Sequence, residues 1–345
     1  MSFFERMDSF LEKYTAETRI SGVLRVTRKD EVLYEKQIGM ADKEKKIPFT
    51  SQSLFTIYSL SKPFCALGLM KLAEGNLINI DCHPKQYLPE ATGFDSRVTI
   101  RHMLHHNSGL PDFMLTEGFQ GRYQTGYPEE LREQLVALSK CPNTFEPGTD
   151  FMYANINFNL CAMIIENVTG MKYEDYMKSE VFKPLGMKHA QIDRMNFFSE
   201  HRVTGYVQEG TQIVPTDRSL HWMLGGGDIL ATVDDVYCLN HAIKHRLLIN
   251  AKNWETILTP SPIGNMGMGC SVSNWYGKKR IMHNGGHRGF RSLHIQLPED
   301  DFDIIYLSNC GWGNARSDYS EAIFDAYYGA NDQMSDGVDM DKGYI

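Results

Sequence analysis

The chain has 345 residues, and its hydrophobic content of 42% is enough to build a sizeable core in one large domain or two interleaved ones. Lys and Arg total 35 against 43 Asp and Glu, and the formal net charge of -8 without a long basic block argues against a nucleic-acid partner. No apolar run is long enough to cross a membrane, no signal peptide is visible, and the 7 cysteines form no CxxC pair, so we expect a cytoplasmic protein with reduced thiols.

The first part of the chain predicts a helix, a hairpin and a second helix. Residues 1–14 carry apolar positions at helical spacing between charges. Residues 20–27 and 31–38 are rich in β-branched and apolar side chains and flank a short polar turn, the pattern of a β-hairpin. A helix is then expected from about residue 60 to residue 74, ending at Gly75.

The middle of the chain predicts helices joined by Pro- and Gly-containing loops. Thr99 is the expected N-cap of a helix over residues 99–106. Residues 113–127 mix glycines with aromatic side chains without a steady period, so this stretch is either a wall or lid of a binding site or a core element; the region around Trp222 is a second candidate wall. Further helices are expected at residues 128–138, 158–168 and 173–182.

The last part of the chain turns to strands again. Thr232 and Asp235 form the pattern of a capping box that opens a helix to about residue 244. Residues 225–227, three glycines without the lysine of a P-loop, are interpreted as a turn bordering a cleft. Strands are expected at residues 203–208, 211–214, 267–273, 279–283, 290–297 and 302–308, followed by a helix over about 314–328.

This order of elements predicts an α+β fold. Strands from both chain ends would form one antiparallel sheet flanked by helices, with a mostly helical domain inserted between them. We place the sheet domain at residues 1–75 and 200–329, the helical insertion at 76–199 and a polar tail at 330–345. The helix after residue 60 then begins at the junction of the two parts, where clefts form.

A serine and a lysine stand three residues apart at the start of that helix. On one helical face their Cβ atoms would be about 5–6 Å apart, so the amine of Lys62 could reach the hydroxyl of Ser59. A serine hydroxyl becomes a good nucleophile when a neighbouring base takes its proton, and a buried lysine can be that base. Ser-x-x-Lys alone is also compatible with a surface serine beside a solvated lysine.

Two further motifs carry polar groups suited to a site. Tyr153 and Asn155 offer a phenol and an amide on the inserted domain. The sequence His283-Asn284-Gly285-Gly286 ends a predicted strand with an imidazole and a backbone that can approach a ligand closely. Taken singly, Tyr153 fits a half-buried core tyrosine and His283 a hydrogen-bonded histidine at a strand end.

Together and in this order, the three motifs resemble the signature elements of the serine penicillin-recognising superfamily, above all its branch of class C β-lactamases, D-alanyl-D-alanine peptidases and esterases. The likeness extends over about residues 5–328 and implies a β-lactamase/transpeptidase-like fold. Segments that match the same branch are residues 99–111, 164–170, 184–187 and 285–290.

The resemblance implies a role for each matched residue. Ser59 would be the nucleophile that is acylated, and Lys62 would help to deprotonate it. Tyr153 would relay protons to the leaving group and later activate water, and Asn155 would hold an amide or carbonyl of the substrate. The backbone N–H groups of Ser59 and Gly286 would form the oxyanion hole.

The third motif departs from the lactamase form. His283 stands where class C lactamases have lysine, and Asn284 where they have threonine, so recognition of a carboxylate-bearing β-lactam is in doubt. Asn284, Gly285 and Gly286 remain candidate substrate-binding residues. His287 also fits His-x-Gly, but His283 is preferred because it follows an apolar run and precedes the double glycine.

The sequence therefore predicts a serine hydrolase that acts through an acyl-enzyme on a small-molecule ester, amide or short peptide. Two alternatives stay open, a non-catalytic binding or regulatory protein with the same fold and a true class C-like β-lactamase. No cofactor is expected. A metal is not expected either, because His102, His105 and His106 lack an HExxH or carboxylate-histidine pattern. Oligomeric state and natural substrate stay open.

Overall fold

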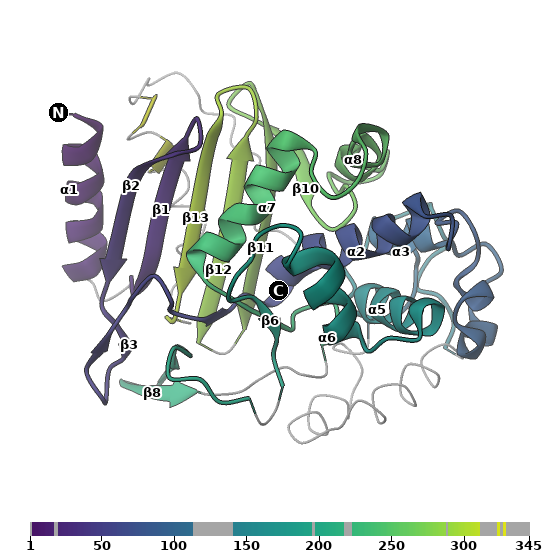
Figure 1. Ribbon diagram of the computed structural model, residues 1–345, viewed down its shortest axis with the longest axis horizontal. Coiled ribbons are helices and arrows are strands. Elements are labelled where there is room, and N and C mark those ends of the chain that lie inside the picture. Colours follow the sequence, from purple (N-terminus) through teal and green to yellow (C-terminus); the bar gives the residue numbers. More distant parts are fainter. Residues whose placement is uncertain are drawn as a thin grey trace.

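A six-stranded antiparallel sheet brings the two ends of the chain together (Figure 1). The computed structural model describes residues 2–16, 20–112, 141–194, 197–216, 223–287, 289–310, 323–324 and 327–328. In sheet order the strands are β10 (Ser271–Trp275), β11 (Lys278–His287), β12 (Phe290–Leu297), β13 (Phe302–Ser308), β1 (Gly22–Arg28) and β2 (Glu31–Ile38).

The junction between the chain ends is the pairing of β1 with β13. The two strands run antiparallel, with Gly22 opposite Ser308 and Arg28 opposite Phe302. Every residue of β13 is buried, because both faces of the sheet are covered there. The predicted α+β fold with a sheet built from both chain ends is confirmed.

Helices cover both faces of the sheet. Met7 and Leu11 of α1 (Phe3–Ala16) pack with Leu24 and Val26 of β1 on one face. The side chains that alternate with these, such as Val23, face the larger core on the other side. That core includes α2 (Lys62–Glu74) and α7 (Val233–His245), and α7 lies in front of the sheet in Figure 1.

The helical part of the chain lies to the right of the sheet in Figure 1, around α2. Its apolar helix α5 (Ile156–Thr169) packs against α2, and the residues of α5 from Ile156 to Ile165 are all buried. The helices are α3 (Ile100–Leu104), α5 and α6 (Tyr173–Tyr176), which continues into a π-helical segment, Met177–Phe182. The boundaries proposed for the two domains stay a prediction.

Several sequence predictions match the local structure. Thr99 is the N-cap of α3, where its hydroxyl accepts the N–H of His102 at 3.2 Å. Thr232 and Asp235 form the expected capping box of α7. The expected features at residues 113–127, at 128–138, at Trp222 and at 330–345 lie outside the described residues, and of the expected last helix residues 323–324 and 327–328 are described, as helical.

Some elements differ from the sequence prediction. The strand expected at residues 279–283 is β11 and continues to His287, so His283 lies inside a strand rather than at its end; pairing with β12 carries the strand through the two glycines. The strand expected at 267–273 is Ser271–Trp275. Elements that were missed are a helix, α8 (Ala251–Leu258), and the short strands β3 (Met40–Asp42), β4 (Ile47–Pro48), β5 (Phe55–Thr56), β6 (Gln191–Ile192) and β9 (Ile229–Ala231).

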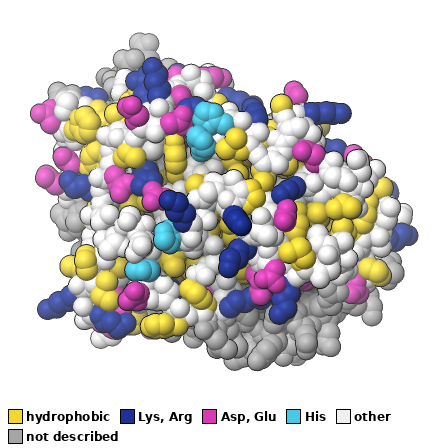
Figure 2. All heavy atoms as spheres, in the orientation of Figure 1, with side chains coloured by type: hydrophobic (Ala, Val, Ile, Leu, Met, Phe, Trp, Pro, Cys, Tyr) yellow, Lys and Arg dark blue, Asp and Glu magenta, His cyan; other side chains and the backbone are white. Residues whose placement is uncertain are grey.

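The remaining described elements are small. A hairpin is formed by β7 (Gly205–Glu209) and β8 (Gln212–Thr216), and 3₁₀ turns occupy Tyr58–Ser61 (η1), Pro84–Gln86 (η2) and Pro89–Gly93 (η3). Among the described residues, no helix has both the length and the apolar character needed to span a membrane. Acidic and basic side chains of the described residues are interspersed over the face shown in Figure 2.

Candidate active site

The Ser59 hydroxyl is carried by the 3₁₀ turn η1, directly before α2. The turn is held from two sides: the N–H of Ile57 donates to the carbonyl of Ile229 in β9 at 3.0 Å, and the hydroxyl of Ser292 in β12 donates to the carbonyl of Ile57 at 2.6 Å. Tyr58 has a φ of 47°, in the left-handed region that side chains other than glycine rarely adopt. The chain therefore turns sharply just before Ser59, and its contacts with β9 and β12 fix the position of this residue.

Lys62 is fully buried, and its amine has three polar neighbours. Nζ lies 3.1 Å from Ser59 Oγ, 2.9 Å from Asn155 Oδ1 and 2.7 Å from the carbonyl oxygen of Gly226. The amide and carbonyl oxygens can only accept hydrogen bonds, whereas the serine hydroxyl can also donate one. A neutral amine has two N–H groups for the two acceptors, so its lone pair is left for the hydroxyl proton of Ser59.

The surroundings of Lys62 favour this neutral form. Burial lowers the pKa of Lys62 to about 7, against the opposing effect of negative charge at Asp112. Asp228 opposes it as well, but only in part near neutral pH, because burial raises the pKa of its own carboxyl to about 7 and leaves that carboxyl partly protonated. Near neutral pH a substantial fraction of Lys62 can therefore act as a base.

Tyr153 lies close to the lysine amine. Its ring centroid is 4.8 Å from Lys62 Nζ, and the ring stacks on the imidazole of His106 with centroids 4.3 Å apart. His106 is itself fixed, because its Nδ1 accepts the N–H of Ala154 at 3.1 Å. Burial keeps the pKa of His106 well below its ordinary value, so the ring that supports Tyr153 is neutral.

Asn155 is held by Asp112. The backbone N–H of Asn155 donates to Asp112 Oδ2 at 2.6 Å, and its side-chain Nδ2 donates to the same oxygen at 3.2 Å. With Oδ1 on Lys62, the amide group is engaged at both ends within the protein. This arrangement makes Asn155 a positioning group for Lys62, while its contact with a substrate stays a prediction.

His283 faces the same region from β11. Its ring centroid is 6.3 Å from that of Tyr153, and its Nδ1 lies 2.6 Å from the carbonyl oxygen of Asn284. Because a carbonyl can only accept, Nδ1 carries the proton and Nε2 is an acceptor, which is buried and has no hydrogen-bond partner among the described residues. Burial, and then the charge of Lys62, lowers the pKa of His283 to about 3, so the imidazole is neutral.

Gly285 lets β11 approach the turn that carries Ser59. A Cβ atom on Gly285 would lie 2.1 Å from the carbonyl oxygen of Ile57 and 2.9 Å from the backbone nitrogen of Ser59. Every other residue type would push the strand and the turn apart. β10 pairs with β11 only up to Met282, so among the described residues no strand covers the edge of β11 beyond it.

The alternation of side chains along β11 places the other residues of the motif that begins at His283. Successive side chains of a strand point to opposite faces, which places Asn284 on the face opposite to His283. His287 lies farther along β11, where its ring makes an edge contact with Tyr58 at 5.7 Å. The roles predicted for Asn284 and for the N–H of Gly286 stay predictions.

The three histidines that follow Thr99 are used within the protein. His102 takes part in the cap of α3, His105 contacts the carbonyl oxygen of Met266 through Nδ1 at 2.8 Å, and His106 binds the backbone of Ala154. These contacts give each imidazole a structural partner.

Comparison with known proteins identifies the family. The family model described as Beta-lactamase matches residues 7–327. The chain belongs to the β-lactamase family. It is 28% identical over 345 residues to penicillin-binding protein 4* of Bacillus subtilis (strain 168), covering 93% of this chain and 74% of that protein.

Solved structures support the same fold for this β-lactamase-family chain. EstCE1, described as a hydrolase with promiscuous acyltransferase activity, has a TM-score of 0.81 at 20% identity, covering 95% of this chain and 98% of that one. The D-amino acid amidase of Ochrobactrum anthropi SV3 has a TM-score of 0.77 at 23% identity, covering 94% and 98%. The superfamily resemblance and the fold predicted from the sequence are confirmed.

Three residues of this β-lactamase-family site were not predicted as site residues. Asp112 follows a Leu-Pro turn, and no spacing rule connects it with Asn155, because the two meet only in the folded chain. His106 was considered only as part of a histidine cluster. Gly226 lies in the glycine turn that was expected to border the cleft, but a carbonyl contact with Lys62 cannot be read from side-chain identity.

Proposed function

We propose that this protein is a serine hydrolase that acts on an ester or amide through a covalent acyl-enzyme at Ser59. The observation that carries the proposal is the environment of the Lys62 amine, which is buried, has two acceptors for its N–H groups and lies 3.1 Å from Ser59 Oγ. This is the geometry that a base needs in order to take the hydroxyl proton.

The proposed reaction has two halves. Ser59 Oγ forms a bond to the carbonyl carbon of the substrate while its proton passes to Lys62 Nζ, and the bond to the leaving group then breaks. Tyr153 passes a proton to the departing oxygen or nitrogen. In the second half a water molecule gives a proton to the Tyr153 phenolate and attacks the acyl carbon. The bond from that carbon to Ser59 Oγ breaks, Oγ takes the proton held by Lys62, and the acid leaves. The N–H groups of Ser59 and Gly286 stabilise the oxyanion, and losing one such donor typically costs about 3–4 kcal/mol.

The neutral state of His283 limits the substrates that we propose. An imidazole with a pKa of about 3 offers no positive charge for a substrate carboxylate. Its Nε2 acceptor, which has no partner among the described residues, suits a neutral donor such as an amide N–H or a hydroxyl. We therefore favour neutral esters and amides, including D-amino-acid amides and short peptides, a range compatible with the named activities of the amidase and of EstCE1.

The first experiment separates this enzyme from a non-catalytic protein with the same fold. The purified protein is incubated with a short-chain p-nitrophenyl ester and with a fluorophosphonate, and adducts are located by peptide mass spectrometry. Ser59→Ala should abolish both turnover and labelling. Ser61→Ala is the matched control, since Ser61 lies in the same turn and its hydroxyl accepts the N–H of Ile229 instead. Equal ester turnover by the Ser59→Ala variant, or no adduct on Ser59, would favour the non-catalytic alternative.

A second experiment separates the esterase or amidase from a true β-lactamase. Rates are compared for neutral esters, D-amino-acid amides and a cephalosporin at equal concentration. We expect the cephalosporin to be the poorest substrate, because no lysine stands at position 283 to bind its carboxylate. Cephalosporin hydrolysis faster than ester or amide hydrolysis would contradict this interpretation of His283 and Asn284.

A further inference from the structure

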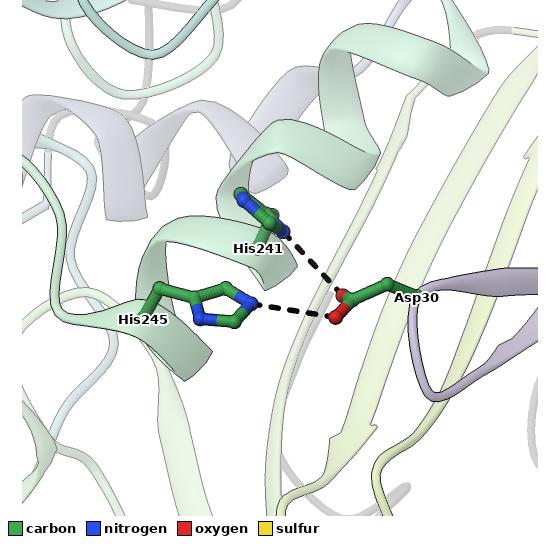
Figure 3. Close-up of side chains that lie close together, drawn as sticks. All are labelled: Asp30, His241 and His245. Atoms are coloured by element: carbon green, nitrogen blue, oxygen red, sulfur yellow. Dashed lines mark hydrogen bonds and ion pairs between the residues drawn. The ribbon is translucent and has the colours of Figure 1, made fainter.

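An aspartate and two histidines come together on the surface, away from the residues of the Ser59 site. Asp30 lies in the turn between β1 and β2, and His241 and His245 lie one helical turn apart on α7 (Figure 3). Nδ1 of His241 is 3.4 Å from Asp30 Oδ1, and Nε2 of His245 is 3.4 Å from Asp30 Oδ2. The two imidazole rings have centroids 4.2 Å apart.

These separations match the edges of a metal coordination polyhedron. Ligands at about 2.0–2.1 Å from a tetrahedral ion are about 3.3–3.4 Å from one another. One donor atom from each of the three residues lies within 4.8 Å of the others. Small side-chain rotations therefore suffice to bring the two histidine nitrogens to the separation that an ion requires. We propose that Asp30, His241 and His245 form a binding site for a divalent transition-metal ion of the Zn²⁺ class.

The donor set selects the class of ion. Two imidazoles and one carboxylate suit Zn²⁺, Co²⁺, Ni²⁺ or Cu²⁺, whereas Ca²⁺ and Mg²⁺ prefer oxygen ligands alone. The side chains of Asp30, His241 and His245 are 39%, 42% and 39% exposed, so water can complete the coordination. Histidine side chains are visible at the surface over α7 in Figure 2.

The surrounding structure holds the three ligands in place. Asp30 has a φ of 63° in the tight turn of the hairpin, and Tyr237 of α7 donates its hydroxyl to Asp30 Oδ1 at 2.9 Å. Such outer hydrogen bonds orient metal-binding carboxylates. Both histidines belong to the last turns of α7, whose partly negative C-terminal end favours a nearby cation.

The Asp30 carboxylate already attracts one positive charge, that of Lys244. Its Nζ lies 2.6 Å from Asp30 Oδ2 and 2.7 Å from Asp301 Oδ2. When an ion binds Asp30, Lys244 can keep its contact with Asp301. An ion there would join the β1–β2 turn to α7 and so tie the sheet edge to the helix that covers it.

The affinity experiment uses Zn²⁺ in calorimetry and Co²⁺ in visible absorption, on the full chain. All proteins carry Cys141→Ser, because the exposed Cys141 thiol would bind the same ions. We expect one ion per chain, with at least tenfold weaker binding after His241→Ala, His245→Ala or Asp30→Asn. Asparagine tolerates the left-handed turn, so Asp30→Asn preserves the hairpin. His189→Ala and His201→Ala are the matched controls and should bind like the parent.

A competitor test distinguishes this site from scattered surface histidines. Lys244→Met removes a cation that shares the Asp30 carboxylate, so Zn²⁺ should bind several-fold more tightly. Zn²⁺ should also raise the melting temperature of the parent but not of the His241→Ala variant. The proposal is overturned if the parent and both α7 histidine variants bind Zn²⁺ equally, if the His189 or His201 control loses binding instead, or if Lys244→Met weakens binding.

Discussion

At the scale of single residues, the protein keeps a lysine amine in a place where its charge is unfavourable. Lys62 is 0% exposed and its pKa falls from the ordinary 10.5 to about 7. The two acceptors at Asn155 and Gly226 hold the amine in position without supplying the negative charge that would keep it protonated. Burial of this residue therefore costs stability, but it leaves an unprotonated amine that can accept a proton near neutral pH.

The proposed base makes a prediction about activity. Lys62→Arg should lower kcat for a p-nitrophenyl ester about 10²–10⁴-fold, because an arginine cannot be deprotonated. The parent should show kcat/KM rising with pH through about 7, as the amine loses its proton. Lys71→Arg, on the same helix, should change neither quantity.

Asp228 supplies the control for this pH dependence, because its own carboxyl has a pKa of about 7. Asp228→Asn keeps an acceptor for the N–H of Gly225 but removes the titrating group. The rise near pH 7 should persist in Asp228→Asn. Its disappearance there would assign the rise to the carboxylate and contradict the role of Lys62.

The same buried amine makes a prediction about stability. Between pH 7 and the ordinary value of 10.5, the unfolded chain holds a proton on Lys62 that the folded chain has lost. Stability rises with pH wherever the unfolded state binds more protons, here by up to about 1.4 kcal/mol per pH unit. Urea unfolding at pH 7.5 and pH 9 should therefore show a larger gain for the parent than for Lys62→Met. Equal gains in the two proteins would show that the pKa of the Lys62 amine is not lowered in the folded protein.

At the scale of elements, the site depends on how closely β11 approaches the turn η1. The contact is made through backbone at Gly285, because a side chain would meet Ile57 O at 2.1 Å. The neighbouring strand β12 adds the hydroxyl of Ser292, which binds the same carbonyl at 2.6 Å. The position of the turn that carries Ser59 is thus set by two strands that follow it by more than 200 residues.

Gly285→Ala tests this approach. We expect kcat/KM for the ester to fall about 100-fold, since a displacement of about 1 Å in a site costs that much. The far-UV circular dichroism spectrum should stay unchanged, because one strand edge moves and the sheet persists. Gly75→Ala is the control: a Cβ there meets its nearest atom at 3.6 Å and should leave activity intact. Full activity in Gly285→Ala would mean that β11 does not set the position of Ser59.

At the scale of the whole molecule, the sheet is completed only when the two chain ends meet. β1 and β2 come from the first residues, and β13, to which β1 pairs over its whole length, comes from the last described strand. Leu24 and Val26 of β1 also form one core with residues of β12 and β13. Folding of the sheet therefore depends on both ends of the chain.

Deletion of residues 1–38 should abolish the native fold. It removes β1 and β2, leaves the edge of β13 unpaired and exposes the apolar core under α1, so we expect aggregated protein by size-exclusion chromatography. Deletion of the predicted polar tail, residues 330–345, is the control and should leave the melting temperature and ester turnover unchanged. A soluble, active protein lacking residues 1–38 would contradict the structural role of the N-terminal strands.

The sequence alone determined the elements with a strong local signal and the groups with a fixed spacing. Ser59 and Lys62 are three residues apart, so local helical geometry already brings them together. The caps at Thr99 and Thr232 are equally local. The order of the three motifs was specific enough to identify the family, and the strand pattern at both chain ends gave the sheet.

Only the tertiary structure decided the contacts between distant segments. Asp112 behind Asn155, the carbonyl of Gly226 on Lys62 and the close approach of Gly285 to Ile57 join parts of the chain that no periodicity connects. The same holds for Asp30 and the two histidines of α7, which lie more than 200 residues away in the sequence. Hydrogen bonds and burial depend on distances in space, and these distances are fixed only when the core has packed.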